Sequence, residues 1–318
     1  MFWSLLILAG GLAVLIKGAD FLIDGSSSIA KKLKVPFIVI GLVVVAFGTS
    51  LPELVVNILA SAQGATDLAI GNVIGSNISN ILLILGVAAI IFPLTLKTST
   101  TWKEVPLSLL AIILVFVVAN DVMLDNANQN IMGRIDGIVL MSFFLIFIYY
   151  TYGVGKVKST EEDGIKTYST WLSIAMIIAG IGGLALGGKL AVDSAVNIAR
   201  IIGISEAVIG LTIVAIGTSL PELAASAVAA FKKNPDIAVG NIVGSNIFNV
   251  FWVLGLSSII RPLPFSIDLN LSVIFAIGIT AILFLFMFVG KRHILERWQG
   301  IGFVLLYVAY LIYVVTTA

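Results

Sequence analysis

The sequence predicts an all-α integral membrane protein whose ten spanning helices form two inverted repeats of five helices each. Of its 318 residues, 59% are hydrophobic and only 11% are charged, whereas soluble domains carry about 25% charged residues. Ten long apolar runs are present, and a set of motifs recurs at one constant offset, which takes residue 48 to 217, 71 to 240 and 93 to 262. A constant offset across several landmarks is not expected by chance, so the chain contains an internal duplication.

The apolar runs give the expected helices, because spanning a hydrocarbon core of about 30 Å takes about 20 residues. They cover residues 3–25, 37–62, 67–91, 104–120, 134–152, 171–194, 206–231, 236–260, 268–290 and 296–316. The first five match the last five at the same offset. The chain is thereby divided into a first half (1–152), a short cytoplasmic linker (153–170) and a second half (171–318).

The basic residues of the loops predict the orientation. When alternate loops are assigned to opposite sides of the membrane, thirteen Lys and Arg residues fall on one side and only three on the other. The positive-inside rule places the richer side in the cytoplasm. We therefore expect a protein of the plasma (inner) membrane with both termini on the extracellular or periplasmic side.

The same charges predict that the repeats are inverted. Five is an odd number of helices, so the second half must be upside down relative to the first. Residues 31–34 contain three lysines and match residues 200–203, which contain one arginine, whereas Gln63 matches Lys232. Inverted repeats are common in transporters, which bind substrate near the midplane between the halves.

Composition also excludes several classes of function. The net charge of +1 argues against nucleic acid as a partner, and the absence of cysteine excludes disulfides, thiolate metal sites and thiol nucleophiles. The only histidine, His293, lies in a basic run and is expected to be solvated. The sequence implies no cofactor and no obligatory protein partner, and we expect the protein to be surrounded by the lipid bilayer.

The second and seventh expected helices share the motif GTSLPE, at residues 48–53 and 217–222. Pro52 and Pro221 lack an N–H and clash with the carbonyl four residues earlier, so both helices should break there. Broken helices at membrane depth line cavities or are buried in protein, so the freed carbonyls are candidate ligands. A carboxylate at this depth costs about 2.5–3.5 kcal/mol on insertion scales. Because a structural kink does not require a carboxylate, Glu53 and Glu222 predict a functional site.

The third and eighth expected helices, which we also expect to be kinked around the site, share the motif GNxxGSN. Asn72, Ser76 and Asn80 are four residues apart and lie on one helix face; their counterparts Asn241, Ser245 and Asn249 repeat the pattern. Gly71, Gly75, Gly240 and Gly244 are expected to allow close helix packing. Asn72, Asn77, Asn241 and Asn246 could equally be cation ligands or interhelical hydrogen-bond partners.

The residues of these motifs favour a hard cation. Two carboxylates, several hydroxyls and amides, and backbone carbonyls offer only oxygen, with a charge of about −2. Such a set suits Ca²⁺, which takes six to eight oxygen ligands, and serves zinc or copper poorly. Other acidic residues have simpler roles. Asp67 and Asp236 are expected to be helix N-caps, and side chains near helix ends should reach the membrane interface: Asp20, Asp24, Lys189 and Asp193.

At these motifs the chain resembles the sodium/calcium exchanger family of the calcium/cation antiporter superfamily, in the ten-helix layout of its archaeal and bacterial members. The resemblance covers essentially the whole chain. It implies cation sites between the halves, where Glu53 and Glu222 bind Ca²⁺ and Na⁺ alternately, and a sliding gate formed by the first and sixth helices. The further ligands that it implies are Thr49, Ser50, Thr218, Ser219, Ser76, Ser245, Asn80, Asn249 and the carbonyls of Ala46 and Ala215.

We therefore expect a secondary antiporter, not an enzyme, that exchanges Na⁺ for Ca²⁺ by alternating access, with both ions bound as substrates and net charge moved in each cycle. One departure bears on stoichiometry: Asn80 and Asn249 are both amides, where some family members carry Asp. A Ca²⁺/H⁺ antiporter or a K⁺-dependent Na⁺/Ca²⁺ antiporter is the nearest alternative. An intramembrane enzyme or a cation channel is a remote one.

Overall fold

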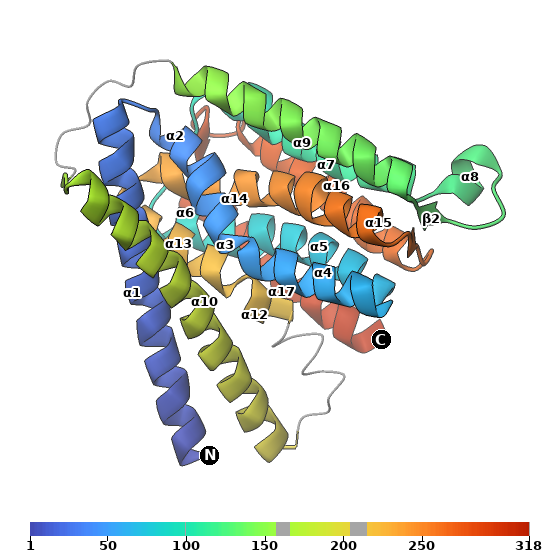
Figure 1. Ribbon diagram of the computed structural model, residues 1–318, viewed down its shortest axis with the longest axis horizontal. Coiled ribbons are helices and arrows are strands. Elements are labelled where there is room, and N and C mark those ends of the chain that lie inside the picture. Colours follow the sequence, from blue (N-terminus) through green and yellow to red (C-terminus); the bar gives the residue numbers. More distant parts are fainter. Residues whose placement is uncertain (99, 157–165, 204–214, 318) are drawn as a thin grey trace.

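Every regular element that the computed structural model describes, in residues 1–98, 100–156, 166–203 and 215–317, is helical apart from two pairs of two-residue strands (Figure 1). The first half contains α1 (Phe2–Leu33), α2 (Phe37–Ile40), η1 (Gly41–Val45), α3 (Ala46–Thr49), α4 (Leu51–Gln63), α5 (Thr66–Ser79), η2 (Asn80–Leu85), α6 (Gly86–Ile91), β1 (Leu94–Thr95), η3 (Thr100–Glu104), α7 (Val105–Val118), α8 (Asp121–Asp125), β2 (Ile131–Met132) and α9 (Arg134–Gly155). The second half contains α10 (Thr170–Ile201), α12 (Ala215–Thr218), α13 (Leu220–Phe231), α14 (Pro235–Ile247), η5 (Phe248–Leu254), α15 (Gly255–Ile260), β3 (Leu263–Pro264), α16 (Leu269–Phe286), β4 (Ile294–Leu295) and α17 (Arg297–Thr317). The η segments are π-helical turns.

Eight of the described helices are long and apolar enough to cross a membrane. A ninth span is formed by two helices, Phe37–Thr49 and Leu51–Gln63, which meet at a bend of 46°. The seventh expected helix falls partly on residues 204–214, which lie outside the described residues, and ends in α13, a shorter apolar helix. The described part of the chain thus contains eight or nine spans where the sequence predicts ten.

The helices α1 and α10 are longer than the sequence predicts. Each has 32 residues, or about 48 Å at a rise of 1.5 Å per residue, which exceeds the thickness of the hydrocarbon core. The expected ends at residues 25 and 194 are wrong, because both helices continue beyond their apolar stretch. Figure 1 shows the two lying side by side, oblique to most of the other helices.

Glycines spaced seven residues apart bring α1 and α10 into close contact. A Cβ atom at Gly11 would lie 2.9 Å from the Ala191 nitrogen, and one at Gly18 would lie 2.7 Å from the Leu184 nitrogen. On α10, a Cβ at Gly180 or Gly187 would meet the α1 backbone at 2.6 or 2.5 Å. Because small residues let helix backbones approach in a membrane, α1 and α10 form a tightly packed pair.

Two continuous helices form the centre of the molecule. The spans Thr66–Ile91 (α5–η2–α6) and Pro235–Ile260 (α14–η5–α15) are 72% and 94% buried inside the protein over their most apolar stretch, against 22–39% for the other six long helices. Neither is broken by a sharp bend; each instead contains a π-helical segment. The two central spans carry the GNxxGSN motifs into the interior.

In the second motif, Gly240 and Gly244 pack closely against another helix, as the sequence predicts. A Cβ at Gly240 would lie 2.8 Å from the Ile38 carbonyl oxygen, and one at Gly244 would lie 2.6 Å from that of Leu42. At Gly71 and Gly75 no described atom lies within 4 Å of such a Cβ. By the repeat offset, residues 38–42 correspond to residues 207–211, which lie outside the described residues.

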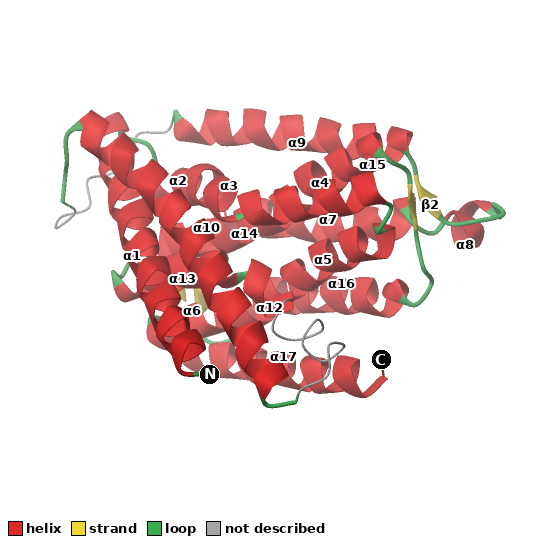
Figure 2. Ribbon diagram, turned by 60° about the horizontal axis from the view of Figure 1, so that its bottom comes forward, coloured by secondary structure: helices red, strands yellow, loops and turns green. Residues whose placement is uncertain are grey.

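The two short strand pairs connect the halves reciprocally. β1 of the first half pairs antiparallel with β4 of the second (Leu94 opposite Leu295), and β3 of the second half pairs with β2 of the first (Leu263 opposite Met132). The repeat offset takes Leu94 to Leu263, so β1 and β3 are repeat equivalents. Figure 2 shows the two pairs at opposite ends of the helix bundle. Such an exchange of partners, at opposite ends, is the pattern that a two-fold relation between inverted halves produces.

The N-cap prediction for the central helices is wrong. Asn234 caps α14 by accepting a hydrogen bond from the Ile237 amide, while Asp236 forms an ion pair of 2.5 Å with Lys97. In α5, Asp67 lies in the first turn, after the cap residue, and makes no capping hydrogen bond. Asp67 and Asp236 thus lie at the start of their helices as predicted, but neither is the N-cap.

Candidate cation-binding site

Both GTSLPE motifs interrupt their helix at the serine. Ser50 separates α3 from α4 and Ser219 separates α12 from α13, with nearly equal backbone angles (φ −85°, ψ 4° and φ −89°, ψ 3°). The following proline is the second residue of the new helix in each case, where its missing N–H is tolerated. Glu53 and Glu222 therefore lie in the first turn of a helix, where the helix dipole stabilises negative charge.

The two carboxylates are fully enclosed in the protein. Glu53 is 0% exposed and Glu222 is 1% exposed. Ser50, which begins the helix of Glu53, lies 3.1 Å from Oε1 of Glu222 through its hydroxyl oxygen. Two buried carboxylates, linked across the halves through Ser50, are costly unless a positive charge accompanies them.

Serines from the central helices complete this link between the halves. The Ser50 hydroxyl also lies 3.0 Å from that of Ser245. Since an ionised carboxylate can only accept, the single Ser50 proton is donated to Glu222 and the Ser245 hydroxyl donates to Ser50. The repeat equivalents of these serines, Ser219 and Ser76, lie 3.4 Å apart. All four hydroxyls are buried.

Asparagines hold the centre of the site in a crossed arrangement. The Asn80 amide nitrogen donates to Oδ1 of Asn246 at 2.9 Å. The Asn249 amide nitrogen donates to Oδ1 of Asn77 and to the Ser76 hydroxyl, both at 3.1 Å. The π-helical segments η2 and η5 begin at Asn80 and one residue before Asn249, so each of these side chains sits where the helix widens. Their amide nitrogens are engaged, which leaves their amide oxygens for another partner.

The network leaves a set of buried oxygens without a hydrogen-bond partner among the described residues. They are Oε1 and Oε2 of Glu53, Oε2 of Glu222, Oδ1 of Asn80 and Oδ1 of Asn249. Buried polar atoms without partners are costly, and a cation is a partner that several oxygens can share. Glu104 and Asp236 also have an oxygen without a hydrogen bond, but their carboxylates are held by Tyr150 and Lys97.

The threonines of the motifs are positioned by asparagines that the sequence left undecided between ligand and hydrogen-bond partner. The Thr49 hydroxyl lies 3.0 Å from Oδ1 of Asn241, whose nitrogen donates to Ser226 at 2.8 Å and to the Glu222 carbonyl at 3.3 Å. In the other half, the Thr218 hydroxyl lies 3.5 Å from Oδ1 of Asn72. A threonine that donates its proton keeps lone pairs that a cation can use.

Asn72, Asn77, Asn241 and Asn246 are thus partners of the candidate ligands. Their side-chain direction could not be read from spacing, because neighbours on one helix face can point to the cation or to the next helix.

The carbonyls of the broken helices are less open than expected. The Ala46 carbonyl accepts from the Ser50 amide at 3.0 Å and lies 3.3 Å from the Thr49 hydroxyl. Ala215 begins α12, and the residues before it lie outside the described part of the chain. Within that part, no three His, Cys, Asp or Glu side chains are grouped so as to hold a metal ion. The candidate site therefore consists of two carboxylates with amides and hydroxyls.

Small residues let α10 cover this site. A Cβ at Gly48 would lie 2.8 Å from Cδ1 of Ile181, and one at Gly217 would overlap the side chain of Val192. The glycines of both GTSLPE motifs therefore touch the same helix, α10. Through these contacts α10, which is itself packed against α1, lies over both motifs.

A helical membrane chain with a buried oxygen-only cluster between two related halves belongs to the class of cation transporters. Comparison with known proteins makes this specific. Residues 3–153 and 172–316 each match the model of the family described as "Sodium/calcium exchanger protein". The chain belongs to this family. This membership supports the function of a membrane antiporter of cations.

Individual relatives cover almost the full chain. The sodium/calcium exchanger MaX1 of Methanosarcina acetivorans is 32% identical, over 97% of this chain and 97% of its own. The solved structure of the sodium-calcium exchanger NCX_Mj superposes with a TM-score of 0.82 and 36% identity, covering 96% of this chain and 97% of that one. A more distant relative, the Ca(2+)/H(+) antiporter ChaA of Bacillus subtilis, is 26% identical over 65% of this chain and 63% of its own.

Proposed function

We propose that this chain exchanges Na⁺ for Ca²⁺ across the membrane and that both ions bind at the buried oxygens between its halves. The observation that carries the proposal is the set of oxygens without partners on Glu53, Glu222, Asn80 and Asn249. The hydroxyls of Ser50, Ser219, Ser76, Ser245, Thr49 and Thr218 would complete the coordination. Since two carboxylates neutralise one Ca²⁺, and six to eight oxygens satisfy it, Ca²⁺ fits this set.

Competition between the ions follows from the same oxygens. Na⁺ and Ca²⁺ have similar radii but different charges, so one site can take either. A Ca²⁺ load leaves the site neutral, whereas three Na⁺ would give it a net charge of +1. The exchange would then respond to voltage, at about 2.3 kcal/mol per charge per 100 mV. Transport that proves insensitive to a clamped potential in vesicles would refute this charge count.

Alternating access would come from the packed pair α1 and α10, acting as a gate over the site. Glycine contacts join the two helices, and α10 touches Gly48 and Gly217 of both GTSLPE motifs. The basic loops favour an orientation with both termini outside, in the plasma (inner) membrane. The gate would then expose the same oxygens first to one side and then to the other.

Ca²⁺/H⁺ exchange is the nearest alternative, because ChaA is a relative and two carboxylates suffice to carry protons. Na⁺ is favoured here by the many buried hydroxyls and amides around the carboxylates, which a proton does not need. A K⁺-dependent exchanger would use the same set.

The test is uptake of radiolabelled Ca²⁺ into proteoliposomes under an opposing gradient of Na⁺, H⁺ or K⁺. We expect uptake with the Na⁺ gradient alone. Uptake that follows the pH gradient, or requires K⁺, would replace the proposal by the matching alternative. Conductive Ca²⁺ flux without any counter-ion would indicate a channel.

A further inference from the structure

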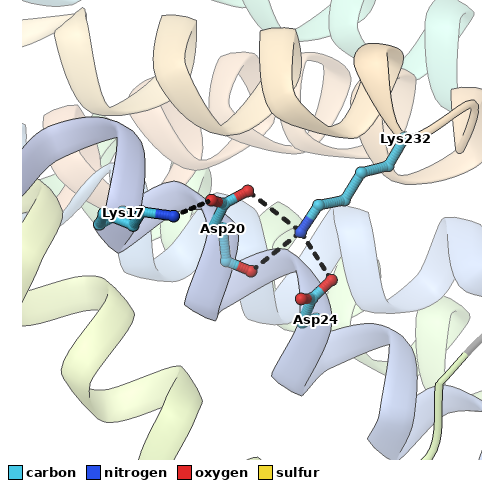
Figure 3. Close-up of polar contacts among 4 residues, drawn as sticks. All are labelled: Lys17, Asp20, Asp24 and Lys232. Atoms are coloured by element: carbon cyan, nitrogen blue, oxygen red, sulfur yellow. Dashed lines mark hydrogen bonds and ion pairs between the residues drawn. The ribbon is translucent and has the colours of Figure 1, made fainter. Parts of the chain in front are cut away.

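One cluster of ion pairs joins α1 to Lys232, which follows the end of α13 (Figure 3). The Lys232 ammonium, just after the end of α13, lies 2.6 Å from Oδ1 of Asp24 and 3.2 Å from Oδ1 of Asp20. It also donates to the Asp20 backbone carbonyl at 3.3 Å. Lys17 occupies the other Asp20 oxygen at 3.3 Å. One lysine thus meets three oxygens on two successive turns of α1.

The repeat equivalent of this cluster is missing at the other end. At the repeat offset, Lys232 corresponds to Gln63, Asp20 to Lys189 and Asp24 to Asp193. The bridging lysine is therefore replaced by a neutral side chain, and one of its two aspartates by a lysine. The structure assigns no ion pair to Lys189 or Asp193 among the residues it describes.

The two ends also differ at one pair of repeat-equivalent positions, residues 56 and 225. At the Lys189 end, a cavity of about 490 Å³ lies between α10 and both proline motifs, lined by residues that include Val56, Lys189 and Asp193. At the Lys232 end, the repeat equivalent of Val56 is Ala225, which is 0% exposed. A cavity of about 700 Å³ also adjoins the Lys232 cluster, lined by Asp20, Asp24 and Lys232 among others. The contrast therefore lies at the two equivalent positions, where Val56 lines a cavity and Ala225 is buried.

We propose that Lys232 is a positioning residue that latches α1 against α13 and biases the transporter toward the state closed at the Lys232 end. This inference rests on the proposed gate of alternating access. Inverted repeats make the two end states similar in packing, so a difference in sequence must set their populations. A shift of α1 by one helical turn, about 5.4 Å, would carry at least one of the two aspartates out of reach of Lys232. Opening this end therefore requires breaking the latch.

The absence of cysteine from the chain makes the populations measurable. Ala225→Cys would react with a water-soluble maleimide only in the state open at the Lys232 end, so its labelling rate reports the minor population. Val56→Cys lines the cavity and serves as the reference for the other end. The probe is the maleimide itself, applied to the full-length protein in detergent, where both ends meet solvent.

We expect Lys232→Gln to raise the labelling rate of Ala225→Cys about three- to fivefold, the effect of a partly exposed ion pair. Lys232→Arg, which keeps the charge, should leave the rate near that of the parent. The adjacent and exposed Lys233 gives the matched control, Lys233→Gln, which should have no effect. The charge exchange Lys232→Asp with Asp24→Lys should restore slow labelling.

Equal labelling in the Lys232→Gln and Lys233→Gln proteins would overturn the latch. So would a parallel rise at Val56→Cys, because that would indicate general loosening of the fold. The labelling assay requires no transport. A chain that failed to exchange Na⁺ for Ca²⁺ would therefore refute the proposed function without changing this result.

Discussion

Replacing Asn246 by leucine should weaken Ca²⁺ binding although this side chain need not touch the ion. The Asn246 Oδ1 accepts a hydrogen bond from the Asn80 amide nitrogen at 2.9 Å, and both side chains are buried. Without it, Asn80 either keeps a buried donor without a partner or rotates and turns its oxygen away from the site. The loss of one buried partner costs about 1–3 kcal/mol, which corresponds to about a 5- to 150-fold loss of apparent affinity.

The repeat supplies the matched comparison. Asn77→Leu removes the corresponding acceptor of Asn249, but the Asn249 nitrogen also donates to Ser76 at 3.1 Å. A second acceptor keeps the Asn249 oxygen in place, so the affinity loss should be clearly smaller for Asn77→Leu than for Asn246→Leu.

A double-mutant cycle separates positioning from a general effect on folding. In an Asn80→Ala background, where the oxygen to be positioned is gone, Asn246→Leu should cost almost nothing further. The assay is the Ca²⁺ dependence of Na⁺-driven uptake, with thermal unfolding as the check on the fold. Full additivity of the two substitutions would refute the positioning role of Asn246.

Three further predictions follow from single contacts. Ser50→Ala removes the hydroxyl that donates to Glu222 and should lower the apparent Ca²⁺ affinity about 10-fold or more. Ser219→Ala should lower it less, because the described contact of Ser219 is to a hydroxyl. Equal losses of affinity would contradict the assigned donor. Gly18→Leu forces a side chain into the α10 backbone and should lower the unfolding temperature, while Gly10→Leu, with no described atom within 4 Å, should not; similar stability would refute the packed pair. Asn249→Asp adds a third carboxylate to the site and should change the charge moved per cycle, measured as the voltage dependence of uptake; an unchanged dependence would place this side chain outside the site.

Much of the candidate site could be proposed from the sequence because its chemistry conflicts with its surroundings. A glutamate after a proline inside an apolar helix is hard to explain by packing. This conflict marks Glu53 and Glu222 as candidate functional residues even when only one sequence is considered. Spacing by four residues placed Ser76 and Asn80 on one face. The constant offset between the repeats then predicted their counterparts in the second half.

The orientation of individual side chains could not be predicted in this way. Asn77 and Asn246 directly follow the candidate ligands Ser76 and Ser245 in the motif, yet they serve as acceptors for the opposite asparagine. That relation crosses the two halves and depends on how they meet.

The ends of α1 and α10 were also predicted wrongly, because the polarity of the residues alone was used to decide where each helix ends. The run Ser26–Ser27–Ser28 and the lysines that follow indicate the end of the hydrocarbon region, but α1 continues to Leu33. Asp20 and Asp24 were expected to reach the membrane interface, and the sequence did not indicate that they share Lys232 from another helix. The seven-residue spacing of Gly11 and Gly18 is visible in the sequence and could have predicted the α1–α10 contact.

Equilibrium binding of Ca²⁺ to the purified protein tests the central claim most directly. The variants are Glu53→Gln and Glu222→Gln, with Glu104→Gln as a control, since that buried carboxylate accepts from Tyr150 instead. The account predicts that both site variants lose Ca²⁺ binding while the control binds as the parent does. Undiminished binding by Glu53→Gln, whose two oxygens have no other partner among the described residues, would contradict it.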